Sequence, residues 1–274
     1  TTTSEFENNY YVLWYVIKAE NVWHVDGVLL KKSLVNLTYN PNAPDGTWNN
    51  MPDGRQYVKD STVIVSDKIP TRKGYVFTGW NTRADGRGTS YDGTDSAHNS
   101  FVIKANTTLY AQWRQKNDVM LYYVALEGGK VKVPSEPVAP VTGVPNGSMA
   151  EANTGCKFVG WYSDRSCTET SKVASSEKFV PEKDENALWE NGTTWYAKFK
   201  VDQTIKFDYT VNYYIKDTTT KVPGIIDNPV TGEGYLGKNI KVDHPASNKG
   251  YKVCANQPKE LIITAEENVV NVYY

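Results

Sequence analysis

The chain has 274 residues, with 30 Lys and Arg residues against 31 Asp and Glu residues and a formal net charge of −1. This balance excludes the strong positive field that nucleic acids and anionic membrane surfaces require of a protein. No apolar run approaches the roughly 20 residues of a membrane-spanning helix, so no span is expected in this fragment. The 8 Trp and 19 Tyr suit small modules, whose cores must be dense in large side chains.

Residues 1–34 form a segment of their own. Two runs of high β-propensity, residues 11–17 and 23–29, flank a possible turn at residues 18–21. The pattern predicts a β-hairpin. Because an isolated hairpin is only marginally stable in water, this one must pack on the following module or belong to a preceding domain.

Three sequence markers then occur twice in the same order, 81 to 86 positions apart. They are residues 35–39 and 119–123, Gly-Tyr-Val-Phe-Thr-Gly-Trp at 74–80 and Gly-Cys-Lys-Phe-Val-Gly-Trp at 155–161, and residues 107–113 and 193–199. Repetition of this kind predicts two copies of one module, at residues 35–114 and 119–200. Each marker alternates like a strand.

A glycine lies inside the second marker of each copy, at Gly79 and Gly160. Glycine within a strand indicates a bulge or a close approach of another backbone. The tryptophans that follow, Trp80 and Trp161, are expected in the core, with a ligand platform as the alternative.

Residues 205–274 contain a third, related module without the Trp after the glycine. Its markers are residues 211–215, 249–253 and 269–273. Short polar linkers at 114–118 and 200–204 predict an elongated tandem array. Helical signals are weak, with a turn or two expected at 92–99 and 174–178.

Residues 35–113 resemble the internalin-type B-repeat, also called the Listeria–Bacteroides repeat, and residues 119–199 resemble a divergent copy. Residues 210–274, with Val-Asn-Tyr-Tyr, Gly-Tyr-Lys-Val and Val-Asn-Val-Tyr-Tyr, resemble a mucin-binding-protein (MucBP) repeat. The resemblance implies a mainly β fold of β-grasp-like modules, with mixed sheets and short helical turns. It also implies an extracellular, sortase-anchored cell-wall protein, whose signal and anchor would lie outside this fragment.

Sequence motifs of catalysis and cofactor binding are not found, so no catalytic, cofactor-binding or metal-binding residue is assigned. His24, His98 and His244 lie far apart without metal-site spacing. The acidic, glycine-rich segments 85–88 and 92–95 could offer oxygen ligands to Ca²⁺, but turn chemistry is favoured.

The chain has three cysteines. Cys156 and Cys167 flank a predicted strand, and a disulfide between them is expected in an exported protein, with two buried thiols as the alternative. Cys254 is then unpaired and is expected to act as a small core residue.

Besides an inserted loop at 186–193, the second module carries a long loop at 133–153, which has no equally apolar counterpart in the first. Val138, Pro140, Val141 and Val144 form an apolar, proline-held stretch there, and exposed apolar surface often marks an interface. These four residues are the predicted ligand contacts. The alternative is that the stretch folds back as an edge strand or covers its own module.

Two functions from different classes fit these features. The first is a non-catalytic adhesin or stalk that binds host mucin glycoprotein through repetition and multivalency. The second is a dedicated binder of a host protein such as an immunoglobulin, favoured by the divergence of the copies. An enzyme is the third possibility, and it lacks a recognisable catalytic pair.

Overall fold

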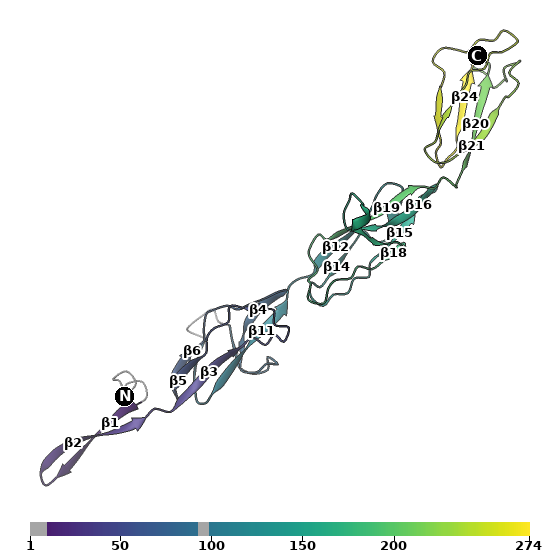
Figure 1. The fold of residues 1–274 in the computed structure, drawn as a ribbon. Helices are drawn as coiled ribbons and strands as arrows, with labels where there is room; N and C mark the ends of the chain where they lie inside the picture. The colour runs from purple at the N-terminus through teal and green to yellow at the C-terminus, as the bar shows by residue number, and fades with distance from the viewer. Residues whose placement is uncertain (1–9, 93–98) are drawn as a thin grey trace. The chain divides into compact units, whose positions relative to one another are not determined.

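The computed structural model describes residues 10–92 and 99–274. With 47% of residues in strands and 1% in helix, it confirms the mainly β fold (Figure 1). The single helical element of the described residues is the 3₁₀ turn η1 (Glu169–Ser171), and in this part of the chain no helix could cross a bilayer. The helix expected at 174–178 is absent, and most of segment 92–99 lies outside the described residues.

The chain divides into two compact units, residues 1–117 and 118–274. Each is described by itself below. The finer division of the sequence at residues 34, 114 and 200 stays a prediction.

The N-terminal segment is the predicted hairpin, formed by β1 (Tyr10–Ala19) and β2 (Val22–Lys31). Glu20 and Asn21 both have positive φ, 47° and 69°, which matches the two-residue turn that suits the twist of paired strands. Its apolar side chains remain largely exposed, with Trp14 at 67%.

The first repeat is built on a five-stranded mixed sheet in the order β5-β3-β11-β8-β9. The strands are β3 (Leu34–Asn40), β5 (Arg55–Val58), β8 (Tyr75–Asn81), β9 (Ser90–Tyr91) and β11 (Thr107–Gln115). β3 and β11 are parallel and the other neighbours are antiparallel. Two short ribbons complete the repeat. They are β4 (Trp48–Asn49) with β7 (Thr71–Arg72), and β6 (Thr62–Ile64) with β10 (Ser100–Val102).

The second repeat has a sheet of the same order and directions, β14-β12-β19-β16-β17. Its strands are β12 (Val119–Ala125), β14 (Ser135–Val138), β16 (Cys156–Tyr162), β17 (Lys172–Ala174) and β19 (Thr194–Val201). A second sheet, β13-β15-β18, contains β13 (Gly129–Val131), β15 (Ser148–Ala152) and β18 (Lys178–Phe179). The shared topology confirms that the sequence repeat is a structural repeat.

Both glycines predicted inside strands lie at register shifts of the β8–β11 and β16–β19 pairs. At Gly79, φ is +134° and a Cβ atom would lie 2.7 Å from the carbonyl oxygen of Tyr91. At Gly160, a Cβ would lie 2.9 Å from the carbonyl oxygen of Ala174. The predicted bulge and close approach are therefore both present.

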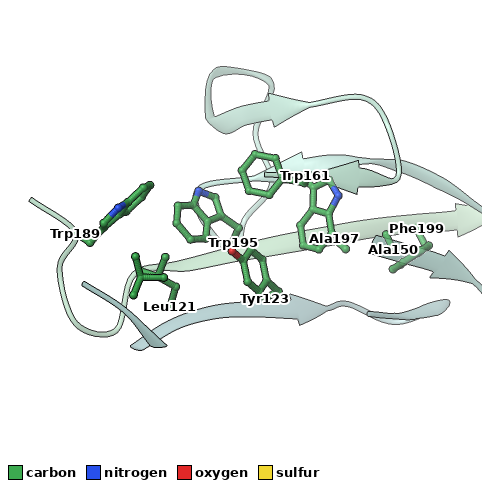
Figure 2. Packing of buried hydrophobic residues seen from close by; sticks show 10 residues of the cluster. Leu121, Tyr123, Ala150, Trp161, Trp189, Trp195, Ala197 and Phe199 are labelled. Carbon is green, nitrogen blue, oxygen red and sulfur yellow. The ribbon is translucent and has the colours of Figure 1, made fainter. Parts of the chain in front are cut away.

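Trp80 and Trp161 are fully buried, which confirms the core interpretation. Each faces an alanine of the central strand, Ala111 and Ala197, at the same register position. In the second repeat the aromatic cluster is larger, and Figure 2 shows Trp195 lying between Trp189 and Trp161.

The third module has a three-stranded sheet, β21-β20-β24, with β20 and β24 parallel. Its strands are β20 (Phe207–Tyr214), β21 (Val230–Gly234) and β24 (Val269–Tyr273), with a separate ribbon of β22 (Asn239–Lys241) and β23 (Glu260–Ile262). Residues 249–253, the marker expected to match β8 and β16, form no strand, so within residues 205–274 this part of the repeat pattern is not reproduced.

Candidate functional site

Two of the four predicted ligand residues of the second repeat are buried, and Val138 belongs to its core. Val138 ends the edge strand β14 and is 4% exposed, Pro140 is buried and Val141 is half-buried. Of the four predicted contacts, only Val144 is open to solvent, at 84% exposure. Val138 therefore lies in an edge strand, and the buried Pro140 belongs to the loop that follows it. Both positions fit the alternative that the stretch pairs with or covers its own module, since burial of apolar side chains is favourable.

Glu136 holds this edge in place. Its buried carboxylate accepts hydrogen bonds from the Tyr123 hydroxyl (2.6 Å) and from the backbone N–H groups of Asn146 and Gly147 (both 2.8 Å). Burial alone would raise the pKa of Glu136, but the bonds from Tyr123, Asn146 and Gly147 together hold that pKa below its usual value. Burial and the neighbouring carboxylate raise the pKa of Tyr123, so its phenol stays a donor.

The other insertion, residues 186–193, also closes on its own repeat. The indole of Trp189, 6% exposed, donates to the Gly143 carbonyl (2.8 Å), and the Trp189 N–H donates to Pro140 (2.9 Å). Sequence reasoning missed both Glu136 and Trp189. The signal for Trp189 was its large apolar side chain within an insertion, since an exposed Trp is costly.

The predicted disulfide is not formed, and all three cysteines are free thiols. Cys156 begins β16, whereas Cys167 lies in the turn beyond the end of that strand. A seven-residue strand is about 20 Å long at roughly 3.3 Å per residue, far more than the reach of a disulfide. Cys167 is buried, and Cys156 and Cys254 are half-buried.

The glycine-rich loop of the first repeat is organised by hydrogen bonds to Asn81. The buried Asn81 amide donates to Gly86 (3.0 Å) and Gly88 (3.3 Å), and its oxygen accepts from the N–H of Gly88 (2.9 Å). This supports the turn interpretation of residues 85–88. Residues 93–95 lie outside the described residues.

Among the described residues, no group of three His, Cys, Asp or Glu side chains could hold a metal ion. His24 is exposed on β2, and the Nε2 atom of His244 lies 2.7 Å from the Pro258 carbonyl oxygen. His98 lies outside the described residues.

A groove of about 390 Å³ beside the edge strand β5 is the candidate binding site of the first repeat. Its lining combines apolar, aromatic and charged side chains, including Leu37, Tyr39, Arg55, Tyr57, Ile64 and Lys68. Arg55 pairs with Leu37 as Glu136 pairs with Leu121, so the two residues hold equivalent positions. Arg55 is exposed. In the second repeat the buried Glu136 is bonded at the equivalent position to residues 146–147, whereas in the first repeat the groove is open there.

Two parts of the chain are similar to a known family of repeats. The Listeria-Bacteroides repeat domain matches twice, at residues 36–112 and 126–186. Repeats of this family occur in surface proteins. The likeness of the third module to MucBP repeats rests on its sequence motifs.

A protein of Evansella cellulosilytica named "Putative Gly-rich membrane protein" is 28% identical over 213 residues. The alignment covers 74% of this chain but 23% of that relative. The two repeat matches together cover just over half of the chain, and their common sheet order places the matched residues on one scaffold. The chain therefore belongs to the Listeria-Bacteroides repeat domain family.

Proposed function

We propose that this chain is a non-catalytic repeat region of a bacterial cell-wall-anchored surface protein that adheres to host mucin glycoprotein. The observation that carries the proposal is the occurrence of two copies of one family repeat on one sheet topology. The largest fully buried side chains of the two copies, Trp80 and Trp161, are used for packing. Repeated modules of this kind supply reach and multivalency without turnover.

We assign mucin binding to the third module. Its sequence resembles a MucBP repeat, and its sheet has its own core, around Val211, Tyr213 and Val272. The hydroxyl of Tyr213 donates to Asp243 (3.0 Å) and that of Tyr274 donates to Pro245 (2.7 Å). These bonds tie the loop 243–245 to the sheet and would give a ligand a preorganised surface.

Binding of the chain to immobilised mucin tests the proposal. Saturable binding that is lost when the O-glycans are removed from the mucin is the expected result. A chain ending at residue 204 is the matched comparison and should bind at least tenfold more weakly if the third module carries the adhesion. Binding to immunoglobulin instead of mucin would favour the dedicated host-protein binder, and binding to neither would contradict an adhesive role.

A further inference from the structure

The second repeat fills a strand position that the described part of the first repeat leaves empty. In the second repeat, β15 is paired on both edges, with β13 on one side and β18 on the other. In the described part of the first repeat, the equivalent strand β6 pairs with β10 alone.

The hydrogen bonds establish this equivalence residue by residue. The N–H of Val65 donates to Asn99 (2.8 Å), as the N–H of Ala150 donates to Glu177 (3.0 Å). Ile64 therefore corresponds to Met149. Residues of an antiparallel strand bond alternately to its two sides, so Ile64 directs its N–H and C=O away from β10.

In the second repeat, that outward side is occupied. The Met149 carbonyl accepts from the N–H of Lys132 (2.9 Å), and Lys130 pairs with Glu151 across the two strands. A salt bridge between Lys130 and Glu151 (3.3 Å) lies on the exposed face, while Val131 packs against the core. A short extended segment thus completes this side of the repeat.

In the first repeat, the segment that corresponds to β13 pairs with a different strand. The chain between β3 and β5 forms β4, which pairs with β7 through Trp48 and Arg72. The outward N–H of Ser66 is instead bonded to the Tyr39 hydroxyl (2.9 Å). Ile64 is 60% exposed, and both Ile64 and Ser66 line the groove beside β5.

We propose that this groove binds an extended peptide segment of a partner protein, added as a strand antiparallel to β6. The backbone of the peptide would bond to Ile64, and a small β-branched side chain would point inward as Val131 does in the second repeat. Main-chain bonds give such complexes their affinity and alternate side chains give specificity, while an unpaired edge is a template for pairing. This inference goes beyond the proposed function, because peptide binding here does not depend on adhesion to mucin.

A synthetic peptide of residues 127–134, which contains β13 and Lys132, tests the proposal on the full chain. Amide resonances of residues 64–68 should shift saturably as the peptide is added. Because Lys132 N–H is the donor toward the strand, N-methylation at Lys132 should weaken binding at least tenfold. N-methylation at Val131, whose N–H points away from that strand in the ladder, should change binding by less than about twofold.

These peptide controls leave the protein unaltered, so they do not depend on the folding of a variant. On the protein side, Ile64→Pro removes an outward N–H and should also weaken binding at least tenfold, whereas Ile64→Ala should not. The proposal is overturned if residues 64–68 show no saturable shift, or if both N-methyl peptides bind equally. It is also overturned if the shifts are confined to residues 149–153, since the peptide would then be displacing β13 in the second repeat.

Discussion

The hydroxyl of Tyr123 lies 2.6 Å from the buried carboxylate of Glu136 and donates a hydrogen bond to it. In the first repeat the equivalent Tyr39 hydroxyl accepts a bond from the N–H of Ser66 (2.9 Å). The equivalent tyrosines therefore bond to the edge strand β14 in one copy and to the backbone N–H of Ser66, two residues beyond β6, in the other. This difference accompanies a second one, since β15 pairs with β13 in the second repeat, whereas in the described part of the first repeat β6 pairs with β10 alone.

Replacement of Glu136 should destabilise the second repeat in a pH-dependent way. Since hydrogen bonds hold the folded pKa of Glu136 below its usual value, its contribution is present above the unfolded pKa and is lost as pH falls through the folded pKa. Glu136→Gln should cost about 1–3 kcal/mol at neutral pH, and the difference from wild type should shrink below about pH 4.

Denaturant unfolding at pH 7 and pH 3 measures this effect. Arg55→Gln is the matched control, because Arg55 holds the equivalent position and is exposed. An equal loss of stability at both pH values would show that packing, not charge, accounts for the role of Glu136.

Trp80 and Trp161 should prove to be equivalent core residues. Each is fully buried opposite an alanine, so Trp80→Ala and Trp161→Ala should each reduce the free energy of unfolding of their own repeat by about 3–5 kcal/mol. Trp48→Ala, at a residue that is 41% exposed, should cost less than about 1 kcal/mol. Thermal unfolding with two resolved transitions would assign each loss to its repeat, and wild-type stability in both core variants would refute the equivalence.

Gly79 should be far less replaceable than Gly46 in the same repeat. Both have positive φ, but a Cβ at Gly79 would lie 2.7 Å from the Tyr91 carbonyl oxygen, whereas nothing lies within 4 Å of one at Gly46. Gly46→Ala should cost about 1 kcal/mol from backbone strain, and Gly79→Ala about 3 kcal/mol because steric overlap is added. Chemical denaturation compares the two, and equal costs would show that the β9 backbone moves away freely.

Mass spectrometry without reduction should find three free thiols after unfolding. In the folded protein Cys167 should be alkylated most slowly, because it is buried and burial raises the pKa of its thiol. A product lacking two alkyl groups at Cys156 and Cys167 would show instead that the protein rearranges to form the bond.

Much of the scaffold was predictable because periodic patterns act locally. The two copies, the strand that carries Gly79 and Trp80, and the hairpin of residues 10–31 all follow from alternation, turn residues and self-similarity in the sequence. The burial of Trp80 and Trp161 also follows, since a large aromatic beside a strand glycine has little alternative to the core.

The state of the sheet edges was decided by tertiary structure alone. Val138 and Val144 look alike in sequence, yet one is 4% and the other 84% exposed, because only Val138 is paired against β12. Cys156 and Cys167 are near in sequence but separated by the length of a rigid strand. The segment before the edge strand pairs differently in the two repeats: β4 pairs with β7 in the first, and β13 pairs with β15 in the second. This choice depends on contacts between residues distant in the chain, which leave no periodic signal in the sequence.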